Sequence, residues 1–306
     1  MPIGATRIFH INVNCSDLER SLRFYRDLLG LEATAHTYPQ PQPGGAFGLD
    51  TAQWDAWILA DGRGLDAGVA VDLLEWQVPR PTGRPYPSVA NLGFGRLCLL
   101  TTDVEAAHTR LTAAGVDCWS PPASFELGVE GMAPVRAFVC SDPDGTAVQL
   151  VQGDAGRLVH VNVNCSDLER SRSFYVDVVG LRPTARSNPG PQDGRPFRLG
   201  DQVEWDAWFL EDPRGDAVFF VDLVEWKRPT PTGAPYDVAN HLGMYRMALL
   251  TDDLDRDYEA LRHDGVHSVT PPADLDMGPG LPHLRALLFP DPDGTMLELI
   301  EAPAAG

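Results

Sequence analysis

Eight side chains capable of polar chemistry recur in pairs about 150 positions apart in this chain. The first half carries His10, Asp72, Arg96 and Gln149, and the second half carries His160, Asp222, Arg246 and Glu298. An imidazole beside a carboxylate can move protons, and a guanidinium can hold an oxyanion. The repeated spacing therefore predicts one polar site in each half of the chain.

The chain is a tandem duplication. Segments 10–31 and 160–181 are identical at 16 of 22 positions, and short motifs downstream recur at a similar offset. These motifs are WDAW at 54–57 and 205–208, VDLLEW at 71–76 with VDLVEW at 221–226, and DPDG at 142–145 and 291–294. An internal repeat of this kind determines the architecture. We predict two domains, at residues 1–153 and 157–306, with the boundary near 153–156.

Each half is itself doubled. The first unit opens with the alternating strand IFHINVN, then a capping box at 16–19 and a helix that ends at Gly30. The second unit opens with a strand at Arg96, followed by a capping box at 102–105 and a helix that ends at Gly115. Short β-type runs follow each helix, and DPDG predicts a hairpin turn. The fold class is therefore α+β, built from four βαβββ units.

Composition excludes several classes of partner. A net charge of −19 repels nucleic acid and anionic membrane surfaces. The start of the sequence shows no secretory signal, and no apolar run approaches the ~18 residues of a membrane span. Five cysteines, an odd number without a CxxC pair, are typical of reduced thiols. We expect a cytoplasmic protein whose partner is a small organic molecule, and homo-oligomerisation stays open.

These motifs resemble those of a known family. DLERSLRFYRDLLGL after a first-strand histidine, together with DPDGTMLELIE near the end, is similar to the vicinal oxygen chelate superfamily. That superfamily includes glyoxalase I, extradiol dioxygenases, methylmalonyl-CoA epimerase and the bleomycin-resistance proteins. The resemblance covers essentially the whole chain as two domains. It implies that paired βαβββ units curl into open, cup-shaped barrels, with metal ligands on the first and last strands of each unit.

The resemblance assigns the eight polar residues to two cups. One cup holds His10, Asp72, Arg96 and Gln149, and the other holds His160, Asp222, Arg246 and Glu298. Metal-dependent members usually carry histidine where this chain has Arg96 and Arg246, and a guanidinium offers no lone pair to a metal ion. We therefore expect no cofactor. If a divalent metal binds, its ligands are His160, Asp222 and Glu298.

We favour a small-molecule enzyme with isomerase, lyase or cyclase chemistry through an enolate-like intermediate. The second cup is the favoured site because it keeps both a histidine and a glutamate. The catalytic residues are then His160, Asp222 and Glu298, and crowding of the two carboxylates is expected to raise the pKa of one of them. Substrate contacts are assigned to Arg246 and Trp208, and in the other cup to His10, Asp72, Arg96 and Gln149.

Three other interpretations stay open. The arginine–carboxylate groups can be structural ion pairs. The protein can be a non-catalytic binder that sequesters a drug, as bleomycin-resistance proteins do. It can also be a metal-dependent extradiol-type dioxygenase, which the two arginines count against.

Overall fold

A computed structural model describes residues 2–154, 156–215, 219–267 and 270–301. Four units of strand, helix and further strands follow one another along the chain, as the repeat predicts. The first unit contains β1 (Ala5–Asn14), α1 (Leu18–Leu22), η1 (Arg23–Leu28), β2 (Glu32–Thr37), β3 (Gln42–Pro43), η2 (Gly45–Phe47), β4 (Thr51–Ala60), α2 (Gly64–Ala67) and β5 (Ala70–Val78). The second contains β6 (Gly93–Thr101), α3 (Val104–Ala113), β7 (Ala123–Phe125), β8 (Val135–Ser141) and β9 (Ala147–Gln152).

The second half repeats this order. The third unit contains β10 (Leu158–Asn164), α4 (Leu168–Ser173), η3 (Phe174–Val179), β11 (Arg182–Ser187), η4 (Arg195–Phe197), β12 (Glu204–Glu211) and β13 (Phe220–Arg228). The fourth contains β14 (Gly243–Thr251), α5 (Leu254–His263), β15 (Ala273–Leu275), β16 (Leu284–Pro290) and β17 (Met296–Glu301). The predicted boundary at 153–156 falls between β9 and β10. Residue 155 and the last five positions of the predicted second domain, 302–306, lie outside the described residues.

The helices begin one residue later than the capping boxes predict. Asp17, not Ser16, is the N-cap of α1, and its carboxylate accepts from the Arg20 backbone N–H at 2.9 Å. Asp103 has the same role at α3, in place of Thr102. Ser16 instead donates its hydroxyl to Asp144 in the DPDG turn at 2.6 Å. The turn of the second unit thereby holds the helix start of the first.

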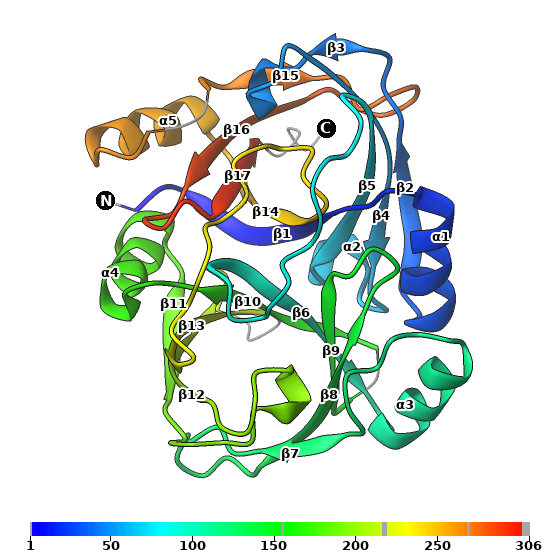
Figure 1. The fold of residues 1–306 in the computed structure, drawn as a ribbon. Coiled ribbons are helices and arrows are strands. Elements are labelled where there is room, and N and C mark those ends of the chain that lie inside the picture. The colour runs from blue at the N-terminus through cyan, green and yellow to red at the C-terminus, as the bar shows by residue number, and fades with distance from the viewer. Residues whose placement is uncertain (1, 155, 216–218, 268–269, 302–306) are drawn as a thin grey trace.

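Each sheet takes one unit from each half of the chain. One sheet has the strand order β15-β16-β17-β14-β1-β5-β4-β2 and joins the first unit to the fourth. The other has the order β11-β12-β13-β10-β6-β9-β8-β7 and joins the third unit to the second. In Figure 1 the blue and the orange-to-red strands share one layer, and the cyan-to-green strands form the other. We call the two concave faces the terminal cup (first and fourth units) and the central cup (second and third units).

In each sheet, the two units are joined where their first strands pair in antiparallel orientation; we call this junction the seam. β1 pairs with β14, with Ile11 opposite Met247, and β10 pairs with β6. The linkers between units cross in the same region, where Thr82 N–H donates to the Asn240 carbonyl at 2.9 Å and Tyr86 stacks on Tyr236. The two halves are therefore interlocked.

The largest core lies on the sheet faces turned away from the cups. It gathers alternate strand residues such as Ile11 and Val161 with helix residues such as Leu22 and Tyr175. Two smaller apolar clusters lie in the cups, one containing Trp54 and the other Trp205. No helix in the described part of the chain is long and apolar enough to cross a membrane.

Candidate functional site

A β-bulge on the opening strand aims two neighbouring side chains into the terminal cup. Ile8 pairs with Leu249 and His10 with Ala248, so one residue of β1 has no opposite partner. Ile8 therefore faces the core while both Phe9 and His10 line the cup. Bulges commonly redirect side chains next to active sites in this way. Strand β10 has the same irregularity before His160.

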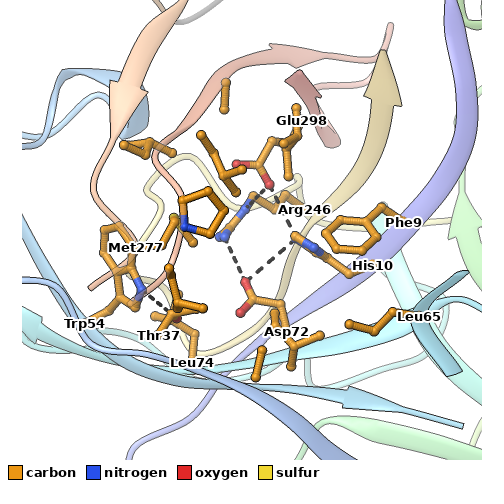
Figure 2. Close-up of a pocket in the computed structure, with 18 of the residues that line it drawn as sticks. Phe9, His10, Thr37, Trp54, Leu65, Asp72, Leu74, Arg246, Met277 and Glu298 are labelled. Atoms are coloured by element: carbon orange, nitrogen blue, oxygen red, sulfur yellow. Dashed lines mark hydrogen bonds and ion pairs between the residues drawn. The ribbon is translucent and has the colours of Figure 1, made fainter. Parts of the chain in front are cut away.

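Four polar residues from four strands meet on the floor of the terminal cup, as Figure 2 shows. Arg246 donates from Nε to Glu298 Oε2 at 2.8 Å and from Nη2 to Asp72 Oδ2 at 2.9 Å. His10 Nε2 lies 3.4 Å from Glu298 Oε2 and 3.8 Å from Asp72 Oδ2. Each of the four is buried. The guanidinium thus lies between two carboxylates, with the imidazole beside them.

The central cup holds the other four predicted residues. Arg96 donates from Nε to Gln149 Oε1 at 2.8 Å and from Nη2 to Asp222 Oδ2 at 3.1 Å. Its third contact, from Nη1, goes to Asn162 Oδ1 at 3.2 Å. His160 comes from the neighbouring strand β10, where it pairs with Cys98.

The predicted pairing of units into cups is therefore wrong. His10 and Asp72 meet Arg246 and Glu298 rather than Arg96 and Gln149. The three residues predicted as catalytic, or as ligands of a metal, cannot share one site, because His160 and Asp222 lie in one sheet and Glu298 in the other. The physical reason is the duplication. The second and the fourth units offer nearly the same strand edges, so the sequence does not show which of them pairs with the first unit.

The charges in the two cups differ. Burial raises the pKa of Glu298, but Arg246 and His10 outweigh it and hold that pKa at about 2. Of the two carboxylates for which a raised pKa was predicted, Glu298 is therefore not the one that has it. Burial raises the pKa of Asp222 to about 6 against the opposing effect of Arg96, so its rise comes from desolvation and not from a second carboxylate. Burial and Arg96 lower the pKa of His160 to about 3, which leaves a neutral imidazole at pH 7.

A cavity of about 150 Å³ opens onto the four polar residues of the terminal cup. Its wall is almost entirely apolar. It is formed by Phe9, Phe47, Trp54, Ile58, Leu65, Leu74, Leu275, Met277, Leu281, Pro282, Leu284 and Ile300, with two alanines. Thr37 adds a hydroxyl that accepts from Trp54 Nε1 at 3.0 Å. Such a concave, apolar pocket with a few converging polar groups is typical of a small-molecule site.

In the central cup, the described residues Arg96, Phe197, Trp205, Val224 and Trp226 line a cavity of only about 20 Å³. Two side chains of this cup are larger than those at the matching positions of the terminal cup. Phe209 stands opposite Asp222 where Ile58 stands opposite Asp72 in the terminal cup. Phe125 occupies the repeat position of Leu275, and its ring lies 4.8 Å from that of Phe197. The terminal cup is therefore the better candidate site.

The assignment of Trp208 to the ligand wall is wrong. Trp208 stands opposite Leu223, which faces the core, so it lies on the helix side of the sheet. There its ring packs under the guanidinium of Arg172 at 5.4 Å. The cup-facing member of each WDAW motif is the first tryptophan, Trp54 or Trp205.

Sequence reasoning missed some residues of the site. Asn12 donates from Nδ2 to Asp72 Oδ2 at 3.1 Å and supports the cluster from below. The alternation in HINVN could have found it, because residues two apart on a strand share a face. Phe9 had no such signal, since only the bulge brings it into the cup. Leu275 ends the short strand β15 and Met277 follows it, in a segment whose sequence carries no pattern that we recognise.

The donor set of the terminal cup does not fit a metal ion as it stands. His10, Asp72 and Glu298 are the types of ligand that a divalent metal uses. The Arg246 guanidinium, however, contacts both carboxylates and fills the space between them. Within the described residues, no cluster of three or more histidine, cysteine or acidic side chains is arranged to hold a metal. That neither cup uses a metal stays a prediction.

Comparison with known structures shows the same fold. Glyoxalase I from Zea mays is 20% identical, with 96% of this chain and 92% of that chain covered at a TM-score of 0.67. A putative dioxygenase from Bacillus subtilis subsp. subtilis str. 168 is 15% identical, with 99% and 87% covered at a TM-score of 0.63. At such identities the likeness shows the fold alone. A search of curated proteins gives no match.

The family model of the Glyoxalase/Bleomycin resistance protein/Dioxygenase superfamily matches residues 7–150 and 157–299. The two matched regions cover nearly the whole chain. The predicted resemblance is confirmed, and the chain belongs to this superfamily.

Proposed function

We propose that the protein is an enzyme that moves a proton next to a carbonyl group in the terminal cup, through an enolate-like intermediate, as an isomerase, lyase or cyclase. One observation carries the proposal. Arg246 lies between Asp72 and Glu298 with its Nη1 unpaired within the described residues, next to His10 and an apolar cavity. This arrangement supplies a fixed positive charge, a proton acceptor and a dry space in one place.

His10 is the base in this proposal. Its Nε2 faces both carboxylates, which favours the tautomer with the proton on Nε2 and leaves the lone pair on Nδ1. Nδ1 has no hydrogen-bond partner among the described residues. It takes the proton from the carbon beside the carbonyl. The electron pair of that C–H bond forms the C=C bond of the enolate, and the π pair of the carbonyl moves onto its oxygen. The imidazolium that forms is stabilised by Glu298, whose low pKa keeps it ionised.

Arg246 stabilises the oxyanion. Burial lowers the pKa of its guanidinium, but Glu298 and Asp72 more than compensate, so the group stays charged. The unpaired Nη1–H is available to the enolate oxygen. In a site shielded from water, one such donor is worth about 10²–10³ in rate. The imidazolium then returns its proton to the same carbon or to a neighbouring one, which completes the reaction.

Deuterium exchange tests this proposal without knowledge of the natural substrate. The protein is incubated in D₂O with a panel of small methyl ketones and 2-oxo acids, and loss of the α-proton signal is followed by NMR. We expect exchange with at least one compound, and a reduction of about 10²-fold or more in His10→Gln. An exchange rate that His10→Gln leaves unchanged would contradict the proposal.

A second candidate is a non-catalytic binder of an apolar molecule. The almost wholly apolar wall of the cavity, which includes Phe9, Phe47 and Trp54, favours it. The same panel separates the two, because a binder takes up a compound in the cup and leaves its α-protons in place.

A further inference from the structure

The floor of the terminal cup contains buried polar atoms that no described residue satisfies. These are Arg246 Nη1, Asn12 Oδ1 and His10 Nδ1. Arg246 and His10 also line the cavity, and each is only 4% exposed. A buried donor or acceptor without a partner costs free energy, so such atoms are rare unless something binds them.

The central cup provides an internal comparison. There the matching guanidinium atom, Arg96 Nη1, donates to Asn162 Oδ1 at 3.2 Å, so all three of the guanidinium's donor nitrogens have partners. The cavity described beside Arg96 is about 20 Å³, against about 150 Å³ beside Arg246. The arginine at the smaller cavity therefore has a partner for each nitrogen, and the arginine at the larger cavity does not. In the central cup the unpaired buried atom is on the imidazole instead, at His160 Nε2. The unpaired guanidinium atom accompanies the larger cavity.

We infer that the terminal cup binds a neutral molecule about the size of one aromatic ring, with a carbonyl oxygen that accepts a hydrogen bond from Arg246 Nη1. This inference rests on the proposed function for the place of the ligand. The inference goes beyond the proposed function because it gives the charge of the ligand, the size of the ligand and the ligand atom that contacts Arg246.

The charge of the floor argues for a neutral ligand. With Asp72 and Glu298 as carboxylates and Arg246 as a guanidinium, the formal charge is −1, and it becomes zero only if His10 takes a proton. A carboxylate or phosphate would add a further negative charge to a buried, apolar space, where an unpaired charge is costly. An ammonium would face the Arg246 guanidinium and offer its free N–H no acceptor lone pair. A carbonyl oxygen meets the donor without adding charge.

The size of the cavity argues for a single ring. A cavity of about 150 Å³ lined by aliphatic and aromatic side chains is the size that holds one benzene molecule. Phe47, Trp54, Met277 and Pro282 are among the side chains that line this space, so a flat apolar body finds aromatic and aliphatic contacts there. The carbonyl then lies at the polar floor and the ring against the wall.

Binding of four probes, measured by calorimetry at pH 7, tests the inference. The probes are acetophenone (neutral carbonyl), ethylbenzene (no carbonyl), benzoate (anion) and benzylamine (cation). We expect acetophenone to bind about 10-fold more tightly than each of the others, the gain of one hydrogen bond to a charged group.

A variant that copies the central cup checks the location. Ile58→Phe with Leu275→Phe installs the larger side chains that the central cup carries at the matching positions, Phe209 and Phe125. We expect acetophenone binding to be lost while the circular dichroism spectrum is unchanged. Phe209→Leu in the central cup is the matched control and should bind acetophenone as the unaltered protein does.

The outcomes are distinct. Preference for benzoate, benzylamine or ethylbenzene, absence of acetophenone binding, or binding that survives the Ile58→Phe/Leu275→Phe change each overturns the inference. Acetophenone binding without α-proton exchange of any compound upholds the ligand class and defeats the proposed function. If 2-oxo acids exchange their α-protons in a reaction that depends on His10 but acetophenone does not bind, the proposed function is upheld and the inferred ligand class is defeated.

Discussion

At the scale of residues, one guanidinium holds two carboxylates in a buried cup. Arg246 contacts both Asp72 and Glu298 at hydrogen-bond distance, and all three side chains are buried. Removing one partner of a buried ion pair leaves a charge without compensation and typically costs about 3–5 kcal/mol. Arg246 therefore combines a structural role with the role that we propose for it in the reaction.

We predict that Arg246→Met lowers the free energy of unfolding by about 3–5 kcal/mol, because two carboxylates are left facing each other. Arg96→Met in the central cup should cost less, since it leaves a single carboxylate, Asp222, whose pKa is already raised. Urea denaturation at pH 7 measures both. Adding Glu298→Gln to Arg246→Met should recover part of the loss, and equal losses for the two arginine variants would count against this account.

Glu298 should also make the protein sensitive to acid. Its pKa in the folded protein, about 2, lies below the ordinary value of 4.5. The folded state therefore binds this proton less readily than the unfolded state, so the stabilisation is complete above pH 4.5 and is lost as the pH falls toward 2. The difference corresponds to about 3 kcal/mol.

Glu298→Gln tests this prediction. The variant should be less stable at neutral pH but should lose less stability than the unaltered protein between pH 4.5 and 2. Denaturation curves at a series of pH values give the free energy of unfolding as a function of pH. If this free energy falls equally in the two proteins between pH 4.5 and 2, Glu298 is not the group responsible.

The sequence identified the polar residues better than the apolar ones. All eight predicted polar positions lie in a cup. The family resemblance assigned them to the first and last strands of each unit, and their recurrence at matching repeat positions supported that alignment. Trp208 was misplaced because WDAW contains two tryptophans on opposite faces, and the sequence does not tell which face is which. Phe9 could not be found, since a bulge breaks the alternation on which such inferences depend.

At the scale of elements, strand β3 of the first unit is hydrogen-bonded to the loop after β15 of the fourth unit, and residues of that loop line the cavity. The Gln42 side chain pairs with the backbone of Asp276, donating from Nε2 to its carbonyl at 2.9 Å and accepting from its N–H at 3.0 Å. Met277, Leu281 and Pro282, which follow Asp276, line the cavity. The two hydrogen bonds therefore hold this loop against the first unit.

We predict that Gln42→Ala loosens the loop and increases the rate at which a ligand leaves the terminal cup. Loss of two neutral hydrogen bonds should also lower the free energy of unfolding by about 1–2 kcal/mol. Stopped-flow displacement of a bound probe measures the rate. Gln192→Ala is the control, because Gln192 has the matching contact with Glu126 in the central cup, at 3.2 Å. A similar effect of both variants on probe release would contradict the assignment.

The elements themselves were predictable where the local signals were strong. Alternation, capping residues and the DPDG turns predict four βαβββ units, and the structure has them. Helix starts were displaced by one residue, because Ser and Asp are adjacent and either can cap a helix. The short π-helical turn from Arg23 to Leu28 has no sequence signal that we recognise.

At the scale of the whole molecule, the two halves exchange units to build two sheets. The seam pairs β1 with β14 and β6 with β10, so each half depends on the other for both of its sheets. The sequence could not reveal this, since the duplicated strands offer nearly the same edges to either partner. Only the three-dimensional arrangement shows whether a unit pairs with the other unit of its own half or with a unit of the other half.

This exchange predicts that neither half is stable as a monomer. A fragment of residues 157–306 alone would expose the edges of β10 and β14, and unpaired apolar strands of this length associate readily. We expect it to sediment as a dimer or larger species. Mixing it with the fragment 1–153 should give a one-to-one complex with the ultraviolet circular dichroism of the intact chain. A folded, monomeric fragment would show that the units of one half can pair with each other.

We propose that the chemistry takes place in the terminal cup and not in the central one. The most direct test compares the α-proton exchange rates of His10→Gln and His160→Gln, which are equivalent changes in the two cups. We predict that His10→Gln loses about 10²-fold or more of the rate while His160→Gln retains it. Loss in His160→Gln with an unchanged rate in His10→Gln would place the chemistry in the central cup and contradict the account.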